Sequence, residues 1–158
     1  MSAPATNPAV TASTAAPTGD GGVHPRLATS VRWGLLVGVI NAAAPVAIWW
    51  LSPTAVHALA VTLIAAIYIG FAVADGRPHV IAVECIVAAM FVIVAAIALT
   101  VSPWLIVAGY FGHGCKDLWQ HRTRFVTGTR WWPPFCFAVD WTVATIIATA
   151  LLAGQSFS

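Results

Sequence analysis

The sequence predicts an all-α protein, a polytopic bundle of five transmembrane helices. Hydrophobic residues make up 59% of the 158 positions and charged residues only 8%, whereas a soluble domain carries about 25% charged residues. Residues 33–74 contain no Asp, Glu, Lys or Arg, and this stretch is long enough for two crossings because one crossing needs about 20 residues. These two observations exclude an ordinary water-soluble globule.

Five apolar stretches follow an N-terminal segment of different composition. Residues 1–26 are rich in Ala, Thr, Pro and Gly, so we expect a disordered cytoplasmic tail ahead of a transmembrane domain at 27–158. Turn-forming pairs such as Ser52-Pro53 and Ser102-Pro103 separate the stretches. The expected spans are Val31–Leu51, Ala55–Ala74, Val80–Thr100, Val101–Trp119 and Phe135–Ala153.

Two of these spans have local features that bear on packing. In the first span, Gly34 and Gly38 favour close approach of another helix, within the chain or in a homo-oligomer. Pro45 predicts a kink in the same span, beside Asn41. The third and fourth spans are expected to form a hairpin, because one helix of about 40 residues would exceed the bilayer.

The basic residues predict the orientation in the membrane. If residues 1–26 are cytoplasmic, all seven Lys and Arg residues fall on that side, as the positive-inside rule requires. We therefore expect a cytoplasmic N-terminus and an external C-terminus in a bacterial plasma membrane, with the lipid bilayer as partner. His57 then falls near the outer rim as an interfacial residue. A net charge of +2 is too small to indicate a nucleic-acid partner.

Ionisable side chains from three spans fall at one depth. At 1.5 Å per residue they lie about 5 to 10 Å below the expected cytoplasmic surface. Such groups usually face the interior of a bundle and find partners there, because a charge in lipid is costly. We therefore predict an interior cluster of acid–base groups or ligands formed by Glu84, His113, Asp117 and Asp140.

Two chemistries suit this cluster. A divalent metal ion would be the cofactor in the first, with Glu84, His113, Asp117 and His121 as ligands. In the second, His113 and Asp117 form a proton relay in which the carboxylate fixes the imidazole tautomer. The alternative to both is structural, with each interhelical hydrogen bond worth about 0.6 kcal/mol. His121 is eight residues beyond His113, so the helix has rotated by about 80° between them, which disfavours a shared face.

Three arginines interleave with aromatic residues before the fifth span. Arg122, Arg124 and Arg130 are candidates for binding an anionic lipid headgroup, because Arg binds phosphate in a bidentate manner. The alternative is a topology anchor at the inner membrane surface.

Residues 104–140 and the upstream Glu84 resemble a family of small bacterial integral membrane proteins of unknown function. The shared features are a Gly-rich helix with the pattern His-Gly-x-x-Asp-x-x-x-His, here His113 to His121, and a preceding helix that carries one Glu. The resemblance implies a bacterial membrane protein and no particular activity.

Three functions therefore remain open. The cluster could belong to a membrane-embedded enzyme that acts on a lipid-like substrate, to a small proton-coupled transporter, or to a non-catalytic scaffold or accessory subunit. Five spans show no inverted repeat, which disfavours the transporter.

Overall fold

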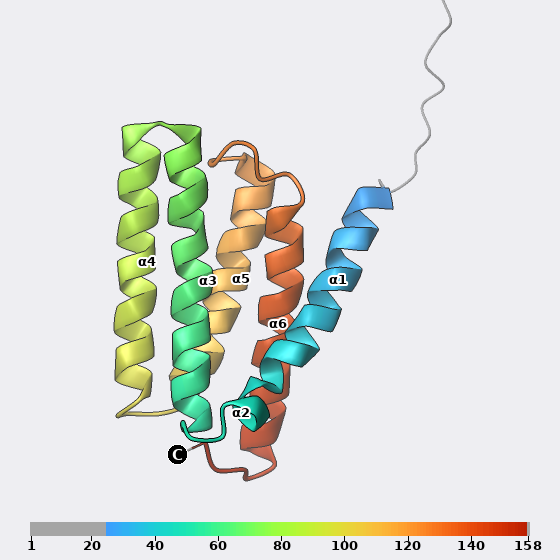
Figure 1. Cartoon of the computed structure of the whole chain (residues 1–158), viewed down its shortest axis with the longest axis vertical. Coiled ribbons are helices and arrows are strands. Elements are labelled where there is room, and N and C mark those ends of the chain that lie inside the picture. Colours follow the sequence, from blue (N-terminus) through green and yellow to red (C-terminus); the bar gives the residue numbers. More distant parts are fainter. Residues whose placement is uncertain (1–24, 158) are drawn as a thin grey trace, which may run out of the picture.

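The computed structural model describes residues 25–157, which form helices joined by turns and contain no strand (Figure 1). The predicted all-α class is confirmed for these residues. The expected tail, residues 1–26, lies almost wholly outside them, because α1 already begins at Pro25. The helices are α1 (Pro25–Ala42), α2 (Ala44–Ala47), α3 (Pro53–Asp75), α4 (Pro78–Ala98), α5 (Trp104–Thr123) and α6 (Trp132–Leu152).

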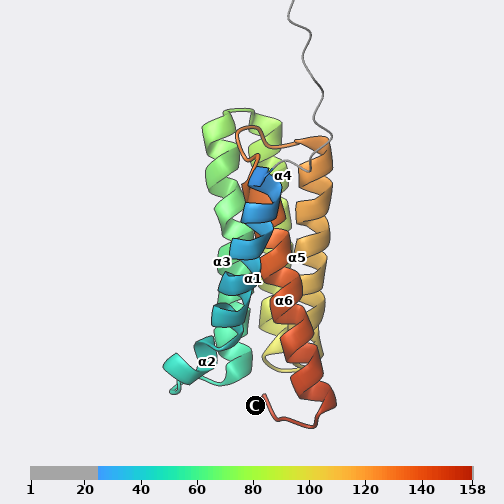
Figure 2. The ribbon, with the colours of Figure 1, turned by 90° about the vertical axis from the view of Figure 1, so that its right-hand side faces the viewer.

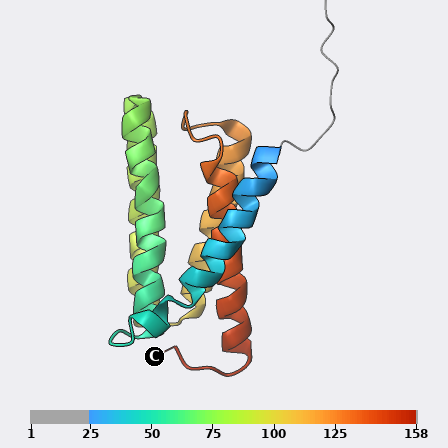
Figure 3. The ribbon, with the colours of Figure 1, turned by 45° about the vertical axis from the view of Figure 1, so that its right-hand side comes forward.

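The five long helices form two layers. Helices α3 and α4 make an antiparallel hairpin, and α1, α5 and α6 make the second layer (Figure 3). Within that layer α6 packs against both α1 and α5, and α1 runs across α6 at an angle (Figure 2). Helix α5 also contacts α3 and α4, so it is the element that joins the two layers.

The two ends of the bundle differ in charge. At one end α1 begins, α3 turns into α4, and α5 turns into α6 (Figure 1). We call it the basic end because Arg77, Arg122, Arg124 and Arg130 lie there. The opposite end holds α2, the α4–α5 connection and the C-terminal segment, and residues 43–53, 98–104 and 152–157 include no Lys or Arg.

Among residues 25–157, three helices, α3, α4 and α6, are long and apolar enough to cross a membrane. Helix α1 contributes a shorter apolar stretch, Leu27–Ala42. The outer face of α4 shows what surrounds the bundle, because Ile86, Met90 and Ile93 are all exposed there. Exposed apolar surface of this extent is typical of contact with lipid, so the protein is a membrane protein.

The ends of α3 show how local sequence sets the helix boundaries. The Ser52 side chain caps the first turn by accepting a hydrogen bond from the Ala55 N–H, and Pro53 occupies the first helical position, where its missing N–H costs nothing. The helix ends at Gly76, whose φ of +80° is readily adopted only by glycine.

The prediction of one continuous first span, Val31–Leu51, is wrong. Helix α1 ends at Ala42 and the short α2 follows from Ala44. Pro45 causes the break, because it has no N–H to donate and its ring would clash with the carbonyl of Asn41. Likewise the fourth span begins at Trp104 and not at Val101, since Ser102-Pro103 cannot continue a helix comfortably.

The glycines of α1 pack within the chain. A Cβ atom at Gly34 would overlap the carbonyl oxygen of Phe135, and one at Gly38 would lie 2.7 Å from the Cβ of Thr142. Both contacts are with α6. The absence of side chains at these positions therefore lets the two backbones approach closely.

A polar clamp joins the two loops at the basic end. The Asp75 carboxylate accepts hydrogen bonds from the Arg77 guanidinium and from the N–H and hydroxyl of Thr127, at 2.8 and 2.7 Å for the two Thr127 bonds. Arg77 also donates to the Phe125 carbonyl. The hydrogen bond to Asp75 raises the pKa of the Arg77 guanidinium, so this group keeps its charge at all ordinary pH values. The clamp fixes the α5–α6 loop to the α3–α4 turn.

Candidate intramembrane polar site

The His113 imidazole lies between two carboxylates in the interior of the bundle. Its Nδ1 atom is 2.7 Å from an oxygen of Asp140 and 3.4 Å from an oxygen of Asp117. All three residues are 0% exposed. We call these residues the His–Asp centre; the structure brings together these three of the four residues expected to cluster.

Two features of the sequence place the His–Asp centre. His113 and Asp117 are four residues apart on α5, so they lie on one face of the helix, and Asp140 reaches them from α6. Gly114 makes the approach of α6 possible, because a Cβ atom there would overlap the Trp141 ring and lie 3.5 Å from the Cβ of Asp140.

Three further side chains extend the His–Asp centre toward α3 and α4. The Tyr68 hydroxyl donates a hydrogen bond of 2.6 Å to Asp117. Lys116 forms an ion pair of 2.8 Å with Glu84, and its Nζ atom lies 3.4 Å from the centre of the Tyr68 ring. Glu84 is thus connected to the His–Asp centre through Lys116 and Tyr68, and it is not in direct contact with His113.

The charges of these residues do not balance when every group is ionised. Lys116 and Glu84 neutralise each other, but a protonated His113 between two ionised aspartates leaves one uncompensated negative charge. A net charge is costly in a fully buried site. In addition, Nδ1 carries one hydrogen at most and faces two carboxylate oxygens. The unbalanced charge and the single hydrogen on Nδ1 both favour one further proton, shared within the His–Asp centre.

Several buried polar atoms of this region have no hydrogen-bond partner within residues 25–157. They include His113 Nε2, Asp140 Oδ1 and both side-chain polar atoms of Gln120. Gln120 is 1% exposed and follows Asp117 by three residues, toward the basic end. Buried polar groups are nearly always hydrogen-bonded, so water, an ion or a moving proton is expected at these atoms.

The His–Asp centre could hold a metal ion. One ligand atom from each of His113, Asp117 and Asp140 lies within 4.8 Å of the other two, and imidazole and carboxylate suit several divalent metals. The ligand set expected from the sequence is wrong in two members. Glu84 is paired with Lys116, and His121 is exposed because α5 has rotated away between positions 113 and 121. Asp140 takes their place.

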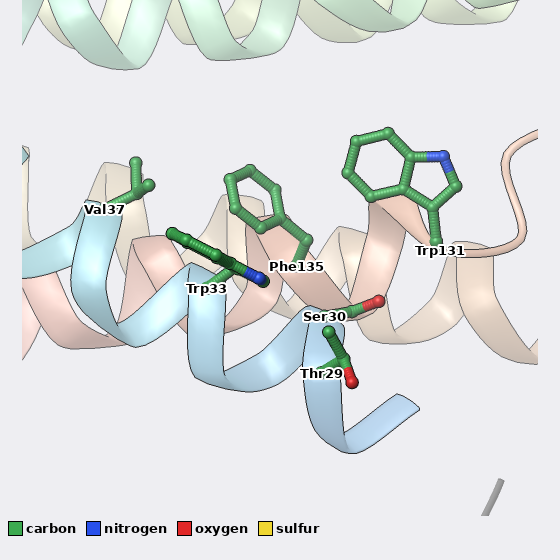
Figure 4. Close-up of a pocket in the computed structure, with 6 residues that line it drawn as sticks. All are labelled: Thr29, Ser30, Trp33, Val37, Trp131 and Phe135. Carbon is green, nitrogen blue, oxygen red and sulfur yellow. The ribbon is translucent and has the colours of Figure 1, made fainter. Parts of the chain in front are cut away.

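Two surface cavities lie away from the His–Asp centre. One, of about 330 Å³, lies in the groove between α1 and α6 and is lined mainly by Trp33, Val37, Trp131 and Phe135 (Figure 4). The other, of about 670 Å³, lies at the break between α1 and α2 and includes Asn41. Neither is lined by a residue of the His–Asp centre.

The three loop arginines lie on the surface of the basic end. Arg122, Arg124 and Arg130 are all exposed, and Arg124 ends α5 in the left-handed conformation with φ 51°. They are therefore accessible from outside the bundle, and binding of a lipid headgroup stays a prediction.

Sequence reasoning missed Tyr68 and Gln120, and it used Lys116 only as one of the basic residues that predict the orientation in the membrane. Tyr68 could have been found from its depth in the bundle. It lies seven residues before the end of α3, and Asp117 lies six residues before the end of α5, so the two residues are at a similar depth. Tyrosine in an apolar helix is easily taken for ordinary core. Gln120 could have been found from its spacing of three residues from Asp117.

The prediction that His57 is an interfacial residue is wrong, because it is 1% exposed. The C-terminal segment covers it. The Phe157 carbonyl accepts a 2.6 Å hydrogen bond from the Thr54 hydroxyl, and the Phe157 ring centroid is 6.4 Å from that of His57.

Protein-family models, curated proteins and solved structures were each compared with the chain. None of them matches it. The resemblance of residues 104–140 to small bacterial membrane proteins stays a prediction and assigns no role to any residue.

Proposed function

We propose that this chain is a five-span protein of the bacterial plasma membrane whose His–Asp centre takes up and releases protons. The observation that carries the proposal is the position of His113 Nδ1 between two fully buried carboxylates, at 2.7 and 3.4 Å. This arrangement offers one proton several acceptors of similar chemistry within hydrogen-bond reach.

The five-span topology is supported by the lengths of α1 and α5. At 18 and 20 residues, these two helices reach the lower range of lengths needed to cross a bilayer. The polar residues of α5 do not oppose this, because Lys116 and Asp117 are directed toward partners on α3 and α4. The arginines at the basic end favour a cytoplasmic location for that end, which puts the start of α1 inside and the C-terminus outside.

The burial of the His–Asp centre favours a proton over a larger ligand. A lipid-like substrate would need the helices around His113 to separate, because the three residues have no exposed surface. A proton can pass along hydrogen-bonding groups without such an opening. Gln120 offers unpartnered polar atoms, among residues 25–157, between the His–Asp centre and the basic end, and we propose that protons enter there.

Proton exchange conserves the charge of the site. A proton that arrives at Asp117 is matched by one that leaves from His113 or Asp140, so the net charge is the same before and after. Tyr68 keeps Asp117 oriented through its 2.6 Å hydrogen bond, and the Lys116–Glu84 pair supplies a fixed charge beside the path. These residues would support proton-coupled transport.

Proton flux into vesicles tests the proposal. Purified protein is reconstituted with a pH-sensitive dye inside the vesicles, and a potassium diffusion potential drives protons inward. We expect flux above that of protein-free vesicles for the wild type, and loss of this flux for His113→Gln and Asp140→Asn. His121→Gln is the matched control, because this exposed histidine lies on the same helix. Equal flux in the wild type and His113→Gln would refute the proposal.

A divalent metal ion is the second candidate ligand. The specific observation in its favour is the spacing of the three ligand atoms, all within 4.8 Å, and two ionised aspartates with a neutral imidazole would balance a charge of +2. Metal analysis of the purified protein separates the two candidates. Stoichiometric metal that is absent from Asp140→Asn would favour the metal site, and no bound metal would exclude it.

The loop arginines are proposed to contact anionic lipid headgroups at the basic end. Their exposure supports this, together with the cavity beside Trp131, which adjoins Arg130 in the sequence. Mass spectrometry of co-purified lipids should show less anionic lipid on the triple variant Arg122→Gln, Arg124→Gln, Arg130→Gln. Unchanged retention would leave only the role of topology anchor.

A further inference from the structure

A second set of buried polar side chains lies between the His–Asp centre and the opposite end. The Tyr110 hydroxyl donates a hydrogen bond of 3.2 Å to the side-chain oxygen of Asn41. The His57 ring packs edge-on against Tyr110, with centroids 6.0 Å apart. Tyr110 is 0% exposed, and the buried His57 Nδ1 has no hydrogen-bond partner in the described part of the chain.

Tyr110 of this second set lies on the same face of α5 as the His–Asp centre. Tyr110, His113, Asp117 and Gln120 follow one another at intervals of three, four and three residues, and each is at most 1% exposed. Residues at such spacings have Cβ atoms about 5–6 Å apart. From Tyr110 to Gln120 the helix rises about 15 Å, at 1.5 Å per residue, which is half of the hydrocarbon thickness of a bilayer, about 30 Å.

The second set also reaches the surface. Asn41, which accepts the Tyr110 hydrogen bond, lines the cavity of about 670 Å³ at the break between α1 and α2. That break lies at the end opposite the arginines (Figure 1). Asn41 is the one polar residue among those that line this cavity, and it accepts the hydrogen bond from the Tyr110 hydroxyl at 3.2 Å, so the cavity is one residue away from that hydroxyl.

We infer that the proton path continues from the His–Asp centre through the Tyr110 hydroxyl and Asn41 to this cavity, and so crosses the whole bundle. This inference rests on the proposed proton exchange at the His–Asp centre. It adds the second half of the path, from the His–Asp centre to the end opposite the arginines, and identifies the Tyr110 hydroxyl as the link between the two halves.

The transfer at Tyr110 is balanced. The hydroxyl oxygen accepts a proton from the His–Asp centre, and the hydrogen that it donates to Asn41 leaves to solvent water entering the cavity, so Asn41 is not itself protonated. The O–H bond that breaks is replaced by the one that forms, and rotation of the hydroxyl restores the starting state. Asn41 is needed only as the acceptor that orients the departing hydrogen.

Tyr110→Phe tests this step, because it removes one oxygen and keeps the ring against His57. In the vesicle experiment we expect its proton flux to fall to the level of protein-free vesicles. Asn41→Leu is the second variant and should show the same loss. Thr145→Val is the control, since it removes a hydroxyl of α6 that bonds only to the carbonyl of its own helix, at Trp141. Circular dichroism checks that each variant is folded.

A second readout separates this inference from the proposed function. Infrared spectroscopy of the protein in detergent detects the carbonyl band of a protonated carboxyl group, which Asp140→Asn or Asp117→Asn should remove. We expect Tyr110→Phe to keep this band while it loses flux. Wild-type flux in Tyr110→Phe, with flux lost in His113→Gln, would overturn the inference and leave the proposed function standing. No flux and no such band in the wild type would overturn both.

Discussion

Helix α6 packs against α1 on one side and α5 on the other, and the two contacts differ in chemistry. Against α1 the contact is apolar and close, with Gly34 and Gly38 bringing the backbones together. Against α5 the contact contains the buried Asp140–His113 hydrogen bond. The first contact shows that small residues are enough to hold two of these helices together. A buried ion pair is thus not a general requirement for helix packing in this bundle, and the charged residues of the second contact call for a separate reason, which we propose is functional.

Deletion of one charged partner should have the largest effect on stability. Asp140→Ala removes the carboxylate that lies 2.7 Å from His113 Nδ1, and the loss of one partner from a buried ion pair costs about 3–5 kcal/mol. The free energy of unfolding in mixed micelles measures it. A cost below about 1 kcal/mol, the range of solvent-exposed pairs, would contradict the buried geometry.

Replacement of the whole His–Asp centre by leucine should abolish proton flux without a matching loss of stability. Exchange of a buried charged network for apolar residues of similar volume is often neutral or stabilising, by about 1–4 kcal/mol. We expect the triple variant His113→Leu, Asp117→Leu, Asp140→Leu to be at least as stable as Asp140→Ala and to have no proton flux. Flux equal to that of the wild type would show that the network is structural.

The α1–α6 contact should be sensitive to volume and not to charge. Gly34→Val would place side-chain atoms against the Phe135 carbonyl, and overpacking of this kind costs about 1–3 kcal/mol. Gly112→Ala is the control, since a Cβ atom there meets no neighbour within 4 Å and alanine stabilises a helix by about 0.5–1 kcal/mol over glycine. Equal unfolding free energies for the two variants would contradict the close packing.

The clamp at the basic end should give the smallest and most local effect. Arg77→Gln removes the guanidinium that binds Asp75 and the Phe125 carbonyl, so the α5–α6 loop loosens. Hydrogen exchange at the Thr127 amide, which donates to Asp75, should become faster while global stability changes little. Because the pKa of Arg77 is raised, its contribution is lost only when the pH rises through that value, and no change is expected near neutral pH. Unchanged exchange at Thr127 would mean that Arg77 does not hold the loop.

Most of the helices could be predicted from the sequence because apolar runs bounded by Pro and Gly determine them. Helices α3, α4 and α6 lie close to the predicted spans. The prediction of the first span was wrong because residues 31–51 are apolar on both sides of Pro45. The composition therefore shows no boundary there, although Pro45 interrupts the helix locally. Apolar composition predicts which segments can contact lipid. It does not predict where the backbone hydrogen bonds of a helix are interrupted.

The His–Asp centre was predictable in part for a similar reason. His113 and Asp117 share one face of one helix, so spacing alone brings them together, and depth was enough to add Asp140. Glu84 was expected to be a member of the cluster, but it forms an ion pair with the long side chain of Lys116 instead. Which of two buried carboxylates a histidine contacts depends on how neighbouring helices rotate, and one sequence does not contain that information.

The most direct test of the central claim is infrared detection of the proton shared in the His–Asp centre. The spectrum of the wild-type protein is compared with those of Asp117→Asn, Asp140→Asn and the leucine triple variant, with His121→Gln as control. Our account predicts a protonated carboxyl band in the wild type and in the control that is lost in the triple variant and in at least one asparagine variant. A wild-type spectrum without this band, or a band that survives in all three variants, would contradict it.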